Sequence, residues 1–227
     1  IEFCMRQVPW LEFKKAVLMG FVTSIRVLIL IFICTLIWTP IGVWIGLRPR
    51  VAEWLQPVIQ FLASIPPNCF YSMLAMFLLH HHLTNYNFWL SPLLILGTQW
   101  YILFNVIAGV RSLPKNLLHA SRLYQLNRRQ RWKRLIIPGI FPDLITGMMT
   151  AAGGAWNATI LAEVVTWNNH QLKAYGLGRY IVDAHNQGNM VLLIMGIMVM
   201  CAYVVIINRL IWLPLFRYAE KYYTIEG

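Results

Sequence analysis

A strongly basic stretch, residues 111–138, lies between long apolar segments and holds eight of the nineteen lysine and arginine residues of the chain. The apolar segments cover residues 17–47, 58–79, 88–110, 140–165 and 190–213. A helix needs roughly 20 apolar residues to cross the hydrocarbon of a bilayer, and each segment has about that length or more. The sequence therefore predicts an all-α, polytopic membrane helix bundle of about five spans, with the basic stretch as a loop outside the membrane.

The composition supports a membrane protein and argues against nucleic-acid binding. Hydrophobic residues make up 59% of the 227 residues, charged residues only 12%, and the mean hydropathy is +0.58. Average soluble domains carry about 25% charged residues. The net charge of +11 comes mainly from cations in the gaps between apolar segments, which is the pattern of a membrane protein and not of a basic binding face. The four cysteines are scattered, so we expect neither a disulfide nor a metal site.

Prolines predict irregularities in the first two spans. The first apolar segment is too long for one straight span and contains Pro40, so we expect a kinked, tilted helix there. The second segment contains Pro66 and Pro67, which interrupt regular helical backbone.

Cation placement predicts the orientation. Thirteen of the nineteen lysines and arginines fall in alternate gaps that share one side, which is then cytoplasmic. Residues 80–87 and 166–189 form the opposite, outer loops. Arg6, Lys14 and Lys15 conflict with this scheme, and either an additional preceding helix or an interfacial helix would resolve the conflict. We expect residues 1–16 to be an extracytoplasmic or interfacial segment, 17–213 the transmembrane domain, and 214–227 a cytoplasmic tail. Without an initiator Met, the chain is expected to be a fragment, a processed subunit or half of a longer polypeptide.

The basic stretch predicts two short helices joined by a tight turn. Ser112 suits an N-cap and Pro114 a first helical turn, which predicts a helix over 115–124. A turn over 125–127 follows, with Asn127 capping a second helix that ends at Pro138. A basic loop held by anionic lipid is the alternative, but lipid attraction does not require this order of helix and turn.

The fourth span carries small residues at helical spacing. Gly147, Ala151 and Ala155 form one ridge, and a second ridge contains Thr150, Gly154, Ala158 and Ala162. Small residues four positions apart let helices approach closely in lipid. Ordinary helix packing and a helix that lines a pathway both remain open.

Polar residues within the spans are candidates for a translocation path, because such residues are costly in lipid unless they face protein or water. They are Arg26, Gln99, Asn105, Trp156, Asn157 and Glu163. For Arg26, attraction of anions, pairing with a carboxylate and snorkelling all remain open. His80, His81 and His82 point in different directions on a helix and do not converge on a metal.

The basic stretch resembles the cytoplasmic loop of permease subunits of binding-protein-dependent ABC importers, which has the form E-A-A-x3-G-x9-I-x-L-P. The pattern falls without a gap on His119-Ala120-Ser121, Gln125, Leu135, Ile137 and Pro138. His119, Ser121 and Gln125 depart from the pattern. The departure at Gln125 affects the turn, because Gly adopts a left-handed backbone freely and Gln does not.

Further motifs are similar to the nitrate/sulfonate/taurine/bicarbonate branch of these permeases. They are Thr23-x-x-Arg26, Gly42-x3-Gly46, residues 60–67, Ala155 to Glu163, Gly176-Leu-Gly178 and Asp183-Ala184. Residues 97–105 and Trp156-Asn157 resemble permeases with two halves fused in one chain, in which this segment is the C-terminal half. Whether the pair is two copies or two fused halves stays open. The resemblance covers roughly residues 17–223.

The resemblance implies an inner-membrane importer subunit whose loop contacts an ABC ATPase. The implied ATPase-coupling residues are Leu118, His119, Ala120, Ser121, Arg122, Leu123, Tyr124, Gln125, Leu126 and Pro138. A second permease copy or half, an extracytoplasmic substrate-binding protein and the lipid bilayer are the other implied partners. Because no Walker motif occurs here, ATP and Mg²⁺ belong to the partner, and this chain binds no cofactor and is not itself an enzyme. The implied cargo is a small solute, with an anion such as nitrate, a sulfonate or bicarbonate favoured. A secondary transporter or channel without an ATPase is the alternative.

Overall fold

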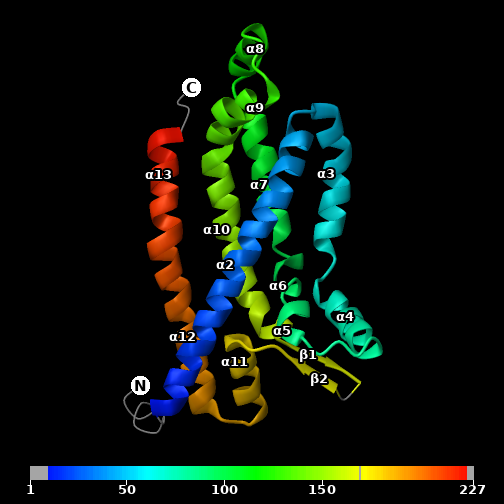
Figure 1. Cartoon of the computed structure of the whole chain (residues 1–227), viewed down its shortest axis with the longest axis vertical. Coiled ribbons are helices and arrows are strands. Elements are labelled where there is room, and N and C mark those ends of the chain that lie inside the picture. The colour runs from blue at the N-terminus through cyan, green and yellow to red at the C-terminus, as the bar shows by residue number, and fades with distance from the viewer. Residues whose placement is uncertain (1–9, 169, 224–227) are drawn as a thin grey trace. The chain divides into compact units, whose positions relative to one another are not determined.

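The computed structural model describes residues 10–168 and 170–223, and it is almost entirely helical (Figure 1). Three helical segments are long and apolar enough to cross a membrane: Trp10–Gly46, Arg128–Ala162 and Met190–Tyr223. Two bent helix pairs become further spans if each pair crosses as one. The predicted all-α membrane bundle of about five spans is therefore confirmed.

The first helix, α2 (Trp10–Gly46), runs through Pro40 as one element, and it begins seven residues before the predicted span. Residues 10–16 of the predicted N-terminal segment thus belong to a helix, while residues 1–9 lie outside the described residues. The C-terminal end of α2 packs closely on α7 (Gln99–Ser112): a methyl group added at Gly42 would lie 2.7 Å from Val106 Cγ1. In a membrane, neighbouring helices compensate for the backbone hydrogen bond that a proline removes.

The second and third spans are broken, not straight. Helix α3 (Pro49–Ser64) and α4 (Asn68–His80) meet at 68°, so this span begins earlier than the predicted residue 58 and breaks at the predicted prolines. The third consists of α5 (Tyr86–Trp89), α6 (Leu93–Leu96) and α7, with a 43° bend before Gln99. The two breaks touch, since a methyl group at Gly97 would lie 3.1 Å from Pro67 Cγ.

The fourth and fifth spans are longer than predicted. Helix α9 (Arg128–Arg131), the π-helical turn η1 (Trp132–Ile136) and α10 (Ile137–Ala162) follow one another without interruption. Likewise α12 (Met190–Ile207), the π-helical turn η2 (Asn208–Trp212) and α13 (Leu213–Tyr223) form one segment. Residues 214–223 of the predicted tail are therefore helical.

An antiparallel hairpin follows α10 where the sequence predicted the end of a helical span. Strands β1 (Val164–Trp167) and β2 (His170–Lys173) pair Val164 with Lys173 and Trp167 with His170. The predicted extension of the fourth span to residue 165 is wrong, because β-branched and aromatic residues here favour an extended strand. Helix α11 (Leu177–Asn186) completes this region.

The chain divides into two compact units. The first consists of residues 10–31, 65–97, 152–168 and 170–207, and its core gathers Leu78, Leu90, Leu94, Ala162 and Leu172 from α4, α5–α6, α10 and β2. The second consists of residues 32–64, 98–151 and 208–223, and its core gathers Ile45, Ala52, Ile59 and Leu103. Many large apolar side chains remain exposed on the long helices, including Phe32, Leu36 and Leu210, as expected for helices that face lipid.

Candidate functional site

The basic stretch folds in the second unit as a helical protrusion. Helix α8 (Lys115–Leu123) projects beyond the ends of α7 and α9 (Figure 1). The turn after α8 contains Gln125 with φ of +51°, in the left-handed region. Gln125 therefore adopts a backbone conformation that glycine takes freely. The Leu126 N–H closes the turn by donating to the Ser121 carbonyl at 3.1 Å.

The tip of this protrusion exposes apolar surface. Leu123 and Tyr124 are 83% and 81% exposed, and Leu117 is 38% exposed. Ser121 is buried, and its hydroxyl donates to the Leu118 carbonyl at 2.8 Å. Exposed apolar side chains on an otherwise basic protrusion are typical of a surface that a partner covers.

The caps of this protrusion differ in part from the sequence prediction. Ser112 is not an N-cap: it ends α7, and its hydroxyl donates to the Gly109 carbonyl at 2.9 Å. Pro114 occupies the N-cap of α8 instead. Asn127 is the N-cap of α9, as predicted, and its backbone N–H donates to Gln130 Oε1 at 3.0 Å.

Pro138 does not end the second helix of the basic stretch. The preceding turn η1 is π-helical, and the Ile137 N–H donates to the Trp132 carbonyl five residues earlier. Proline lacks the N–H for a standard helical bond and crowds the preceding turn, and a wider turn accommodates both effects. The helix consequently continues into α10.

The small-residue ridge of α10 forms a close helix contact at Gly147. A methyl group at Gly147 would lie 3.0 Å from Asn105 Cβ and 3.2 Å from the Ile102 Cα of α7. Ala151 and Ala155 are buried, whereas Gly154 and Ala158 are half-buried. Gly147 is therefore a site of close packing between α10 and α7.

The predicted path residues are divided between the two units. In the second unit, Gln99 accepts a hydrogen bond from Trp38 Nε1 at 3.3 Å, and Asn105 Nδ2 donates to the Tyr101 carbonyl at 2.8 Å. In the first unit, Trp156 is buried and stacks on Tyr203 at 6.4 Å, while Asn157 is exposed. Their role in a path stays a prediction.

Arg26 and Glu163 lie together in a buried site of the first unit. Glu163 is 1% exposed, and Arg26 Nη1 donates to its Oε1 at 2.8 Å. The Thr23 hydroxyl donates to the same oxygen at 2.9 Å. The backbone N–H groups of Gly178 and Arg179 donate to Oε2 at 2.7 and 3.2 Å. All four partners donate, which suits the acceptor oxygens of a carboxylate.

Two further hydrogen bonds extend this site to the start of α11. The Leu177 N–H donates to Thr23 Oγ1 at 2.9 Å, which leaves the Thr23 hydroxyl proton for Glu163. Arg26 Nη2 donates to the Tyr175 carbonyl at 2.9 Å. Nη1 and Nη2 of Arg26 therefore contact two different segments, Glu163 after α10 and Tyr175 before α11.

Glycines make the close approach at this site possible. A methyl group at Gly176 would collide with both carboxylate oxygens of Glu163, and one at Gly178 would collide with the Thr159 carbonyl. Only glycine leaves room for the carboxylate to reach the N–H groups at the start of α11. Thr23, Gly176 and Gly178 belong to motifs that assign them no role, and their spacing in the sequence alone did not reveal that they surround Glu163.

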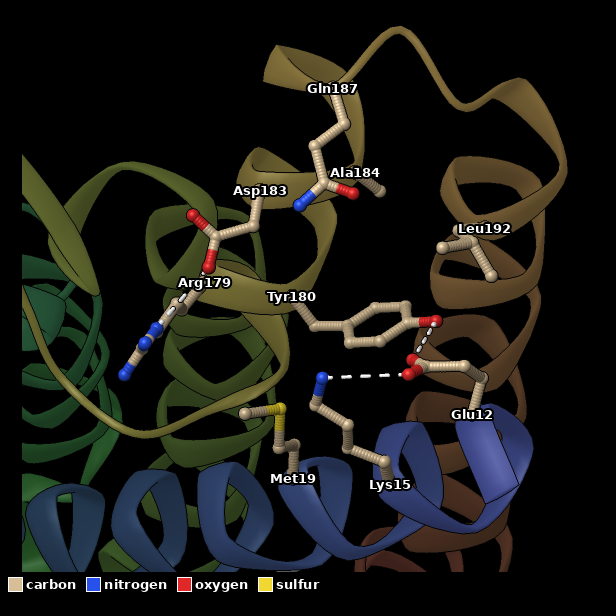
Figure 2. A pocket seen from close by; sticks show the side chains of 9 residues that line it. All are labelled: Glu12, Lys15, Met19, Arg179, Tyr180, Asp183, Ala184, Gln187 and Leu192. Carbon is tan, nitrogen blue, oxygen red and sulfur yellow. Dashed lines mark hydrogen bonds and ion pairs between the residues drawn. The ribbon is translucent and has the colours of Figure 1, made fainter. Parts of the chain in front are cut away.

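A charged pocket of about 200 Å³ lies in the same unit (Figure 2). Glu12 and Lys15 of α2 point toward Tyr180 of α11, with Tyr180 Oη 3.3 Å from a Glu12 carboxylate oxygen. Burial, followed by the Glu12 charge and hydrogen bond, raises the pKa of Tyr180. Asp183 pairs with Lys173 at 2.6 Å and Arg179 at 3.3 Å.

The charges of this pocket are paired with one another. Burial alone would raise the pKa of Asp183, but the hydrogen bonds and charges of Lys173 and Arg179 together lower it. Lys15 lies 3.7 Å from Glu12. This arrangement ties β2 and the start of α2 to α11.

Comparison with known proteins assigns the chain to a family. The model of the family described as "binding-protein-dependent transport system inner membrane component" matches residues 38–218. The chain belongs to this family, and the predicted membership is confirmed.

Several relatives have names that agree with the predicted branch. The chain is 26% identical to the bicarbonate transport system permease protein CmpB of Synechocystis sp., over 74% of this chain and 56% of the relative. It is 26% identical to the nitrate import permease protein NrtB of Leptolyngbya laminosa, over 66% and 50%. It is 24% identical to the taurine transport system permease protein TauC of Escherichia coli, over 62% and 49%. The chain thus spans about half the length of these relatives.

A solved structure shares the fold. A chain of the MetNI methionine ABC transporter, in inward facing conformations, aligns with a TM-score of 0.65 and 16% identity. The alignment covers 88% of this chain and 93% of that chain.

Proposed function

We propose that this chain is a membrane permease subunit of an ABC importer, with a small anion as cargo. Family membership over residues 38–218 carries the proposal. Relatives named for bicarbonate and nitrate transport support an anionic cargo, and the relative named for taurine transport adds a zwitterion that carries a sulfonate group. With a second copy or half, the chain would form the translocation path, and an extracytoplasmic binding protein would deliver the cargo.

ATP hydrolysis belongs to a partner ATPase in this proposal. The α8 protrusion is its docking element, and the exposed side chains of Leu123 and Tyr124 support that role. Apolar anchors that are buried on binding carry much of the energy of an interface. A cleft on the ATPase that accepts these two side chains would transmit its movement to α7 and α10, which flank the protrusion in sequence.

The test is Leu123→Asp in the complete importer, purified with its ATPase and binding protein. A carboxylate at the apolar anchor is expected to weaken ATPase capture by about tenfold or more, because an unpaired charge is costly to bury. Uptake of bicarbonate, nitrate and taurine would be measured in proteoliposomes, and any uptake should fall in parallel.

Asn116→Asp is the matched control, because it adds the same charge to the exposed first turn of α8 and removes no apolar surface. This control should retain capture. Normal capture and uptake by Leu123→Asp would contradict the docking role. ATP-independent uptake by the wild type would favour a secondary transporter.

A further inference from the structure

We infer that Arg26 and Glu163 form a positioning pair that fastens the 164–186 region to α2, and that neither side chain contacts the transported anion. The inference rests on the proposed function and refines it, because the pair contains the deeply placed cation of the first span. A positioning pair predicts that substrate preference is unchanged when both charges are removed, whereas a pair that contacts the substrate in the translocation path predicts a change.

The Arg26–Glu163 pair is closed to a ligand. Glu163 is 1% exposed and the Arg26 side chain 11% exposed. Arg26 Nη1 donates a hydrogen bond to Glu163, and Nη2 donates one to the Tyr175 carbonyl. A guanidinium that is both neutralised by a carboxylate and hydrogen-bonded to backbone has little attraction left for a passing anion.

The contacts of the pair and of Thr23 join three separate parts of the chain. Thr23 and Arg26 lie on α2, Glu163 follows α10, and residues 175–179 lead into α11. The separations in sequence are large: Arg26 and Glu163 are 137 positions apart, and Thr23 and Leu177 are 154 positions apart. Contacts at these separations can hold the hairpin and α11 against α2.

Hydrogen bonds also fix the backbone of Glu163. The Ala174 N–H donates to the Glu163 carbonyl at 2.9 Å, and the Glu163 N–H donates to the Thr159 carbonyl at 3.0 Å. Main chain and side chain of one residue thus connect the end of α10, the end of β2 and the start of α11. In a transport cycle these elements would move as one body.

The experiment compares single and double substitutions in the complete importer. Removing one partner of a buried ion pair leaves the other unpaired, whereas removing both charges is far less harmful. In Arg26→Met/Glu163→Gln, the Gln carbonyl oxygen can still accept from Gly178 and Arg179. Its amide can donate to the Thr23 oxygen, and no guanidinium opposes it.

Two measurements are made on each variant. The first is the rate of tryptic cleavage after Lys173 and Arg179 in the detergent-solubilised complex, which reports how firmly the region is held. The second is uptake in proteoliposomes of bicarbonate, nitrate and taurine, with KM separated from the maximal rate. Thr23→Ser keeps the hydroxyl and is the conservative control for Thr23→Val, which removes it.

We expect Glu163→Gln and Arg26→Met each to speed cleavage by about tenfold or more. The double variant should return cleavage and maximal uptake rate to within about threefold of wild type, with KM and anion preference unchanged. Thr23→Ser should behave as wild type and Thr23→Val as the single variants.

The inference is overturned if the double variant holds the region firmly but loses uptake or changes anion preference, because the charges would then act on the substrate. It is also overturned if no single variant speeds cleavage. If wild-type protein takes up none of the anions, the proposed cargo fails, while the cleavage rates still decide the role of the pair.

Discussion

At the scale of single residues, partners decide what a charge does. Arg26 and Glu163 stand out in the sequence because charges are rare in apolar spans. The sequence left pairing and anion attraction open for Arg26, and the 2.8 Å contact shows that the two charges pair. No local pattern could have revealed this, because the two residues are 137 positions apart in the sequence. In the same way, the need for glycine at position 176 becomes apparent only in the structure, where a side chain would collide with the Glu163 carboxylate.

The left-handed turn at Gln125 leads to a prediction at this scale. A non-glycine residue pays roughly 1 kcal/mol for a left-handed backbone, partly offset by the larger freedom of glycine in the unfolded chain. Gln125→Gly should therefore stabilise the turn by a few tenths to about 1 kcal/mol. Hydrogen exchange of the α8 amides would show slower local opening.

Gln125→Ala is the control for this effect, since it shortens the side chain but keeps Cβ and hence the strain. Equal exchange in the Ala and Gly variants would mean that the turn is not limited by the backbone at this position.

At the scale of elements, prolines and turns account for most differences from the sequence prediction. Each of the two π-helical turns precedes a proline by two residues, at Pro138 and Pro214, and each contains the letters Arg-Leu-Ile, at 134–136 and 209–211. The helices continue because a wide turn accommodates a proline that would end a standard helix. The hairpin had a readable signal in Val-Val-Thr-Trp-Asn, where Asn168 adopts a φ of +44°.

The tie between β2 and α11 should depend on pH. The pKa of Asp183 is lower in the folded protein than its ordinary value, because Lys173 and Arg179 outweigh the effect of burial. Its contribution is therefore present above the ordinary value of 3.8 and is lost as the pH falls through the lower, folded value. Hydrogen exchange of peptides from residues 170–186 should show increased opening in that acidic range and little change between pH 7 and 5.

Asp183→Asn removes the titrating group and should show weakened protection with a flatter pH dependence over the acidic range. If the wild type and this variant follow the same pH dependence, another group controls the opening.

At the scale of the whole molecule, orientation is the property that cation placement predicts. We expect α8 on the cytoplasmic side and the hairpin outside, because lysines and arginines concentrate in cytoplasmic loops. Single cysteines at Asn116 and His170, both exposed, would be introduced after removal of the native cysteines. In intact cells, a membrane-impermeant maleimide should label the cysteine at position 170 and not that at 116.

Permeabilised cells provide the control, because both positions should then react. Labelling of position 116 from outside intact cells would reverse the orientation and remove α8 from the reach of a cytoplasmic ATPase.

The amino-acid sequence by itself determined that this chain spans a membrane several times, where its basic protrusion lies and which family it resembles. These properties depend on local composition, because a span needs only enough consecutive apolar residues and a motif needs only spacing. Tertiary structure alone decided that the charge of Arg26 is neutralised by Glu163, that Thr23 orients its proton toward the same carboxylate, and that Gly176 and Gly178 have no room for a side chain. Those facts depend on which distant segments meet, and in a low-dielectric interior the meeting decides whether a charge is free to act or is held in a pair.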